Sequence, residues 1–146
     1  MGTPNTPKPV RYFVSLIYRE NGQMPGIEDK LITLLGEIAS RTNPVTFLHT
    51  NYYEKEMGKS LLRYFLLFKP LRDREELSSV KLATNDIETN TLEEGRRTIN
   101  IDPGYIALEH VILATTKGFA HRIYLGKGIF GDLTLMYSEG AFKPLP

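Results

Sequence analysis

Two long runs of apolar and aromatic residues constrain the fold of this chain most. Residues 11–18 read Arg-Tyr-Phe-Val-Ser-Leu-Ile-Tyr, and residues 61–69 read Leu-Leu-Arg-Tyr-Phe-Leu-Leu-Phe-Lys. In the first run apolar side chains occupy both odd and even positions, which is typical of a strand buried on both faces in the middle of a sheet. The second run also predicts a strand, which Pro70 is expected to end. We therefore expect the chain to fold around a β-sheet.

A helix and a short strand are predicted between these two runs. Turns are expected at Asn21-Gly22 and Pro25-Gly26. Apolar residues at helical spacing then predict a helix over residues 27–40. Asn43-Pro44 should end this helix, and residues 45–48 are predicted as a strand.

A second helix is predicted between Asp73, which would cap it, and Gly95. Its expected inward face consists of Leu77, Val80, Thr84 and Ile87, and its mostly outward residues are Glu75, Glu76, Lys81, Asp86 and Glu88. Residues 98–101 are predicted as the next strand, which Asp102-Pro103-Gly104 should break.

The order of these elements favours an α+β fold. A strand–helix–strand–strand–helix–strand order is typical of a ferredoxin-like layer, an antiparallel four-stranded sheet with both helices on one face. Residues 105–116 fit a helix, with Asp102 as its cap and Pro103 in its first turn, but they also alternate like a strand, and we favour the helix. Residues 121–125 and 129–137 predict a β-hairpin extension.

Length and composition limit the domain organisation. We expect residues 1–9, which hold three of the nine prolines, to form a flexible N-terminal arm, and residues 10–146 to form a single α+β domain. The arm does not resemble a secretory signal, and no run approaches the roughly 18–20 apolar residues needed to span a bilayer. We therefore expect a cytoplasmic protein without a membrane partner.

Charge and residue types exclude several kinds of chemistry. The formal net charge is only +1, so the charge balance gives no support for a nucleic acid partner. The absence of cysteine excludes disulfides, thiolate metal sites and a cysteine nucleophile. His49, His110 and His121 are far apart and lack metal-ligand spacing, so no metal site is predicted. The serines include no Gly-x-Ser-x-Gly motif for nucleophilic catalysis.

Polar residues near the predicted strand ends are candidate site residues. Lys117, His121 and Arg122 could present three donors to one bound anion, although ordinary solvated charges are the alternative. Alternation along a strand places Asn100 and Asp102 on one face, where an amide and a carboxylate could bind a hydroxylated ligand. The alternative for Asp102 is that its carboxylate caps the following turn.

A pair of carboxylates is available at Glu54 and Glu56. If this segment is extended, the two side chains lie on one side and could act as acid and base. An exposed run of charged residues is the alternative interpretation.

Four segments together resemble a known prokaryotic family, the domain of unknown function 4416 family. They are Asn51-Tyr52-Tyr53-Glu54-Lys55-Glu56-Met57-Gly58, Lys81-Leu82-Ala83-Thr84-Asn85, Asn100-Ile101-Asp102-Pro103-Gly104-Tyr105, and Leu113-Ala114-Thr115-Thr116-Lys117 continued by Ala120-His121-Arg122-Ile123-Tyr124-Leu125. The resemblance covers nearly the whole chain from Lys8 to Pro146. It implies no established activity, and nothing in this sequence supports the GTP-binding label that some members carry.

The resemblance also implies a set of family-like positions. These are Tyr53, Glu54, Glu56, Gly58, Lys81, Asn85, Asn100, Asp102, Gly104, Tyr105, Lys117, His121 and Arg122. Many are polar and titratable, which favours a ligand site over a purely structural signature. Relatives usually continue past the Phe-Lys-Pro-Leu-Pro segment into an aromatic tail, so a site completed by such a tail is expected to be altered here.

Our first hypothesis is a polar pocket for an anionic small molecule, such as a nucleotide or a phosphoester. The expected ligand-binding residues are Lys81, Asn85, Asn100, Tyr105, Lys117 and Arg122, and the expected catalytic residues are Asp102, His121, Glu54 and Glu56. Of these, Asp102 and Glu54 or Glu56 would act as acid/base groups or metal ligands. The sequence identifies no cofactor and leaves open whether the site is catalytic.

Two other hypotheses involve macromolecular partners. In the first, the sheet binds single-stranded RNA through Tyr12, Phe13, Tyr64, Phe65 and Phe68, but the RNP pattern is absent and a core position is the simpler interpretation. In the second, a homo-oligomer buries the open sheet face or the hairpin edge.

Overall fold

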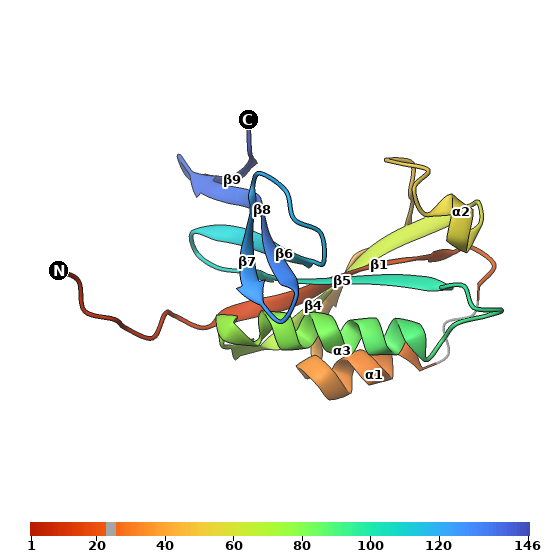
Figure 1. Ribbon diagram of the computed structural model, residues 1–146, viewed down its shortest axis with the longest axis horizontal. Coiled ribbons are helices and arrows are strands. Elements are labelled where there is room, and N and C mark those ends of the chain that lie inside the picture. Colours follow the sequence, from red (N-terminus) through yellow and green to blue (C-terminus); the bar gives the residue numbers. More distant parts are fainter. Residues whose placement is uncertain (23–25) are drawn as a thin grey trace.

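The computed structural model describes residues 1–22 and 26–146, and in this part of the chain one antiparallel sheet contains nine strands (Figure 1). Neighbouring strands follow the order β2-β4-β1-β5-β6-β8-β7, with β3 paired to β4 and β9 paired to β8. The strands are β1 (Val10–Arg19), β2 (Ile38–Arg41), β3 (Val45–Thr46), β4 (Leu61–Arg72), β5 (Ile99–Ile106), β6 (His110–Thr115), β7 (Arg122–Gly126), β8 (Ile129–Ser138) and β9 (Ala141–Pro144). The helices are α1 (Ile27–Leu35), α2 (Glu54–Met57) and α3 (Leu77–Thr89), and the 3-10 helix η1 (Arg74–Glu76) precedes α3.

The predicted ferredoxin-like layer is wrong. The sheet does not stop at four strands. Strand β6 pairs with the end of β5, and strands β7, β8 and β9 then extend the sheet further. The hairpin that the sequence treats as an extension is therefore part of the main sheet. Strands dominate this fold, and helices cover only part of it (Figure 1).

Strand β5 continues through Pro103, so the predicted break at Asp102-Pro103-Gly104 is also wrong. The N–H of Ile101 points to the edge of β5 that faces away from β1, where the Glu88 carboxylate accepts it at 3.0 Å. Alternate residues of a strand direct their N–H groups to the same edge. Pro103 therefore lacks its N–H on that edge, and its pairing with Val14 of β1 is retained.

The helix predicted over residues 105–116 is replaced by the end of β5 and by β6. Asp102 and Pro103 lie inside a strand, so they cannot begin a helix. The β7–β8 hairpin is confirmed, and β9 follows it as a strand that the sequence pattern did not indicate.

Helix α1 is shorter than predicted, because it ends at Leu35. Gly36 has a φ of 97°, and a Cβ atom there would lie 2.5 Å from Cγ of Pro70, so this position needs glycine. The chain then turns into β2, which contributes a strand where a helical end was expected. The predicted Pro25-Gly26 turn includes Pro25, which lies outside the described residues.

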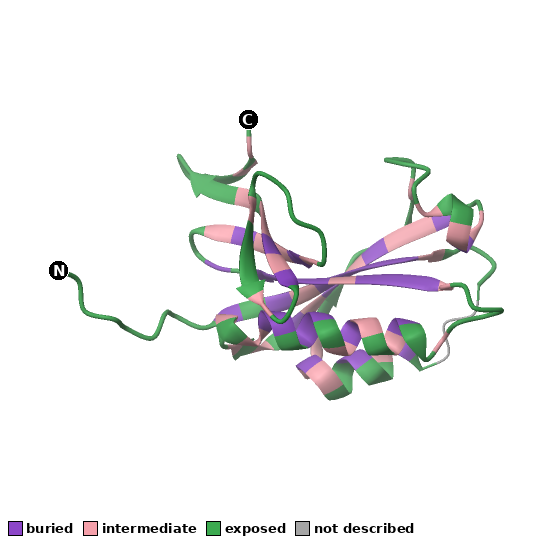
Figure 2. Ribbon diagram, in the orientation of Figure 1, coloured by how far each residue is buried: buried purple, intermediate pink, exposed green. Residues whose placement is uncertain are grey.

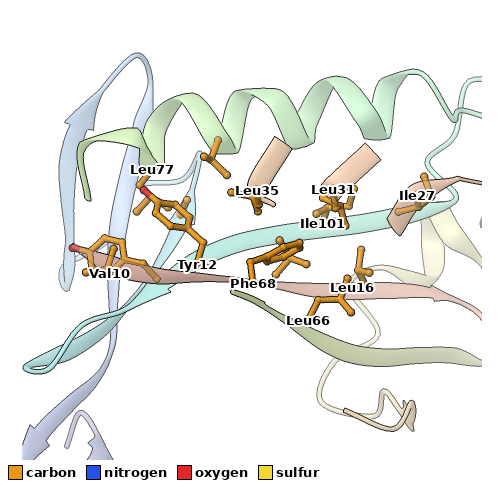
Figure 3. Packing of buried hydrophobic residues seen from close by; sticks show 14 of the residues in the cluster. Val10, Tyr12, Leu16, Ile27, Leu31, Leu35, Leu66, Phe68, Leu77 and Ile101 are labelled. Atoms are coloured by element: carbon orange, nitrogen blue, oxygen red, sulfur yellow. The ribbon is translucent and has the colours of Figure 1, made fainter. Parts of the chain in front are cut away.

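The main core lies between the sheet and helices α1 and α3, which cover the same face (Figures 1 and 2). Tyr12 and Phe68 from the sheet pack with Leu31 and Leu35 from α1 (Figure 3). The Tyr12 hydroxyl donates a hydrogen bond of 2.8 Å to the main-chain oxygen of Asp73. Burial of so many large side chains on one face is the main stabilising contribution in this region.

This core removes three of the aromatic side chains that were expected to stack on RNA bases. Tyr12, Tyr64 and Phe68 are buried under the helices and are not available to stack on bases. Phe13 and Phe65 are partly exposed, and their ring centroids lie 6.4 Å apart. Three of the five aromatic candidates are therefore core residues.

Helix α3 is buried on a wider face than its apolar pattern indicates. Leu77, Val80 and Thr84 are buried as predicted. Lys81 and Glu88 are also buried, with relative exposures of 6% and 5%, although they were predicted to lie mostly outside. These two charged residues lead into the candidate site described below.

No helix of the described residues is both long enough and apolar enough to cross a membrane.

We predict that Gly104→Ala destabilises the protein by about 1–3 kcal/mol, because overpacking forces backbone or side chains to move. A Cβ atom at Gly104 would lie 2.4 Å from the main-chain oxygen of Ile112 and 2.7 Å from Cζ of Phe13. Urea denaturation should measure the loss. Gly2→Ala, where a Cβ atom meets no atom within 4 Å, is the control. Equal stability of the two variants would contradict the close β5–β6 approach.

Candidate functional site

The site begins at an open edge of β5. Only Gly104, Tyr105 and Ile106 of β5 pair with β6, so the preceding residues 99–103 have no strand partner on that side within the described part of the chain. Side chains of α3 take the place of the missing strand. Glu88 accepts the N–H of Ile101 at 3.0 Å, and Nζ of Lys81 donates to its carbonyl oxygen at 3.4 Å. The main-chain groups of Ile101 are thus satisfied by two charged side chains.

A recess with a volume of about 730 Å³ lies beside this edge. Its walls come from α3, β5, the end of β6 with the residues that follow it, β7, β8, and the segment between β3 and α2. Six of the ten predicted site residues line it, namely Lys81, Asn85, Asn100, Asp102, Lys117 and Arg122. Groups that are distant in the sequence therefore meet at one place.

Asp102 belongs to a group of bonded polar residues that line the recess, and we refer to this group as the floor: Lys81, Glu88, Arg97, Asn100 and Asp102. Its carboxylate accepts Nζ of Lys81 at 3.1 Å and Nδ2 of Asn100 at 2.8 Å. The predicted projection of Asn100 and Asp102 from one face of the strand is confirmed. In place of the capping alternative, the carboxylate bonds to these two side chains within a continuous strand. The side chain of Lys81 is 8% exposed and that of Asp102 is 22% exposed, so this ion pair is largely shielded from water.

Arg97 connects the floor to α2. Its Nε donates to Glu56 at 2.7 Å, while one terminal nitrogen donates to Oδ1 of Asn100 at 2.9 Å and to Glu88 at 3.3 Å. The main-chain N–H of Arg97 also donates to Glu56, at 3.2 Å. Arg97 therefore links three elements, α2, α3 and β5, through charge-assisted hydrogen bonds.

Burial raises the pKa of Glu88 above its ordinary value of 4.5. The hydrogen bond from the N–H of Ile101 and the charges of Lys81 and Arg97 act in the opposite direction, but desolvation is the larger effect. Burial also raises the pKa of Tyr53, another lining residue, to about 12. The floor is therefore a desolvated environment in which charges interact strongly.

Lys117 and Tyr52 meet at the rim of the recess. Nζ of Lys117 donates to the Tyr52 hydroxyl at 2.5 Å and lies 4.3 Å from the centroid of the Tyr52 ring. This hydrogen bond and the lysine charge lower the pKa of Tyr52. Both residues are exposed, so this contact joins two surface segments across the mouth of the recess.

Arg122 and Asp132 form a second ion pair at the wall. Nε of Arg122 donates to Asp132 at 2.8 Å, and Nε2 of His121 lies 3.2 Å from the same carboxylate oxygen. Arg122 also donates to the main-chain oxygen of Lys117 at 3.1 Å. Lys117, His121 and Arg122 are thus neighbours, as the sequence indicates, but Asp132 already binds two of the three.

Four predicted site residues do not line the recess. His121 contacts Asp132, and Glu56 accepts a hydrogen bond from Arg97, but neither His121 nor Glu56 lines the recess itself. Glu54 is exposed on α2, so Glu54 and Glu56 do not form a pair in an extended segment. Tyr105 faces the helix-covered side of the sheet, where the centroid of its ring lies 6.2 Å from that of the Tyr12 ring. Tyr105 is an odd number of residues from Asp102 in the same strand, so the two side chains project from opposite faces.

Arg97, Glu88 and Asp132 are the functional candidates that the sequence reasoning missed. The spacing of Glu88 offered a signal, since it stands seven residues after Lys81 and four after the buried Thr84, on the same helical face. Arg97 and Asp132 carry no local pattern that distinguishes them from surface charges. Their roles depend on pairing between distant elements.

No group of three His, Asp or Glu side chains suited to a metal ion occurs within residues 1–22 and 26–146. The floor carboxylates are instead bonded to Lys81, Arg97 and Asn100.

A family model described as a domain of unknown function, DUF4416, matches residues 8–146. No curated protein and no solved structure matches the sequence.

We predict that the pKa of Glu88 makes the stability of the protein pH-dependent. Because this pKa is raised above 4.5, the folded state holds a proton that the unfolded state releases, and stability falls as pH rises through this interval. Glu88→Gln removes this titration. The free energy of unfolding of the wild type, minus that of Glu88→Gln, should therefore decrease as pH rises from below 4.5.

Urea denaturation at a series of pH values would measure this difference. Glu75→Gln, at an exposed residue of η1, controls for the loss of one carboxylate. A difference that grows with pH would show that the ion pairs with Lys81 and Arg97 outweigh desolvation.

Proposed function

Because the chain belongs to the DUF4416 family, whose description states no activity, we propose its function from the recess: the protein binds a small molecule that carries an anionic group, such as a nucleotide or a phosphoester. The observation that carries the proposal is the convergence of four cationic side chains, Lys81, Arg97, Lys117 and Arg122, on one recess of about 730 Å³. This volume lies in the range of ordinary ligand pockets.

Lys117 is the expected contact for the anion. Within the described residues, Lys81, Arg97 and Arg122 are each paired with a carboxylate, whereas Lys117 contacts the neutral hydroxyl and ring of Tyr52. A phosphate at the rim would replace this contact by one in which both the donor and the acceptor are charged. The adjacent Thr115 and Thr116 also line the recess.

The remainder of the ligand would lie toward the floor. Asn85 from α3 and the Asp102 carboxylate offer donors and acceptors for sugar hydroxyls, while Tyr53 and Leu113 provide less polar surface. This arrangement supports a ligand with an anionic end and a hydroxylated body. Asp102, which lines the recess, is the group that we propose would move a proton if the ligand reacts. A cytoplasmic location, expected from the sequence, forms part of this proposal.

We predict that at least one compound in a panel of nucleotides and sugar phosphates stabilises the wild type against heat, and that Lys117→Glu abolishes the effect. A ligand at 100 times its Kd adds about 2.7 kcal/mol to the free energy of unfolding. Lys30→Glu, an exposed position on α1, makes the same change in net charge away from the recess. Differential scanning fluorimetry would measure both variants.

One further variant refines this test. Asp102→Asn should weaken binding of compounds with hydroxylated bodies while retaining binding of inorganic phosphate, because only the floor is changed. If no compound stabilises the wild type, or if Lys117→Glu and Lys30→Glu respond alike, the recess is not an anion site.

A further inference from the structure

A second hollow, of about 500 Å³, lies where β1 begins and β4 ends, and it shares no lining residue with the recess. Residues of β4, of the β5–β6 turn and of β8 and β9 line it, and most of them are apolar. We refer to this hollow as the arm-side groove, since Pro9, the last residue of the N-terminal arm, forms part of its wall.

The arm-side groove exposes large apolar side chains. Leu108 is 73% exposed, Leu71 is 61% exposed, and the aromatic residues Tyr137 and Phe142 are 50% and 40% exposed. The rings of Tyr137 and Phe142 lie 5.2 Å apart at an interplanar angle of 71°. Scattered exposed leucines need no explanation, but apolar and aromatic residues gathered around one groove are typical of an interaction surface.

The N-terminal arm, residues 1–9, has the composition that such a groove binds. It contains Pro4, Pro7 and Pro9, and the spacing of Pro4 and Pro7 is the Pro-x-x-Pro pattern of polyproline II segments, which dock into aromatic-lined grooves. Every residue of the arm is exposed, and the arm leads away from the body of the molecule (Figures 1 and 2). Arg74 fixes its base by donating to the main-chain oxygen of Lys8 at 3.2 Å.

We propose that this arm docks in the arm-side groove of a second copy, so that two chains exchange arms in a homodimer. The arm's own groove is a poor partner, because Pro9 lines the groove while the chain leaves it in an extended direction. For Pro4 and Pro7 to return, the chain would have to reverse its direction within a few residues of Pro9, whereas residues 1–9 lead away from the body (Figure 1). At about 3.1 Å per residue, a polyproline arm of nine residues reaches about 28 Å, enough to cross to a neighbouring molecule.

Reciprocity follows from the position of the arm. Because each chain carries the arm and the groove at the same end of the sheet, one two-fold axis brings both arms to both grooves. The second contact then forms within an already associated pair, so two short arms hold the dimer better than one would. This exchange also shields the exposed apolar groups around Leu108 from water.

Disulfide trapping tests the exchange directly, because the chain contains no cysteine. Thr6→Cys and Leu108→Cys are prepared as separate proteins, mixed and oxidised. In the oxidised mixture we expect a cross-linked species with twice the 16.6 kDa mass of one chain. Leu48→Cys, a leucine outside the groove that is at least as exposed as Leu108, with 83% exposure, replaces Leu108→Cys in the control and should give much less product.

The doubly substituted chain, with Thr6→Cys and Leu108→Cys together, separates exchange from folding back. Exchange gives covalent dimers, whereas an arm that occupies its own groove gives an internal disulfide at the monomer mass and overturns the proposal. Equal cross-linking of Leu48→Cys and Leu108→Cys also overturns it.

Light scattering of the protein without added cysteines completes the test. We expect a dimer for the wild type and a halved mass for Leu108→Asp and for the Pro4→Ala, Pro7→Ala double variant, both at exposed positions. Circular dichroism checks that each variant is folded. A wild type that stays monomeric over a wide concentration range overturns the proposal, even if a synthetic peptide of residues 1–9 binds the groove.

Discussion

The open edge of β5 is the constraint on which the rest of the site depends. A buried main-chain N–H or C=O without a partner costs about 1–3 kcal/mol, so a strand that loses its neighbour must find other partners. Glu88 and Lys81 supply them for Ile101. Since each brings a charge into a buried position, each needs a counter-charge, which Arg97 and Asp102 provide. In this chain the divergence of β6 from β5 is thus accompanied by a charged network.

The same divergence shapes the recess. The β6–β8–β7 part of the sheet carries the residues around Lys117 and Arg122, and the segment between β3 and α2 carries Tyr52 and Tyr53. Residues of both segments line the recess beside the unpaired edge of β5, and they cover the charged floor only in part. Inner charges are paired and held by hydrogen bonds, while Lys117 at the rim is bonded to a neutral phenol. The recess therefore combines a hydrogen-bonded floor with a lysine at its rim that is bonded to a neutral group.

Local sequence patterns predict the elements whose faces are set by burial. The runs at 11–18 and 61–69, the apolar face of α3 and the β7–β8 hairpin follow from periodicity and turn residues. The errors occur where pairing between distant segments decides the outcome. Pro103 looks like a strand breaker until the N–H that it lacks is seen to fall on an edge without a strand partner. Glu88 looks like a surface charge until the main chain of Ile101 is seen to need an acceptor.

The location of the site residues could be predicted better than their interactions. Lys81, Asn85, Asn100 and Asp102 lie on consecutive elements, so helix and strand periodicity brings them together. Asp132 and Arg97 could not be assigned, because nothing near them in the sequence states which charge they meet. Tyr105 was misplaced by the expected turn at Pro103, since a continuous strand sends it to the opposite face from Asp102.

A purely structural role for the network is the main alternative to a binding site, and energetics argue against it. Replacing buried ion pairs by apolar residues of similar volume is often neutral or stabilises a protein by about 1–4 kcal/mol. An apolar helix face with one polar residue to serve Ile101 would close this edge with fewer charges. The chain instead places Lys81, Glu88, Arg97 and Asp102 around one gap and leaves the gap accessible from the side of Lys117. A retained energetic cost beside an accessible recess favours a site whose charges meet a ligand.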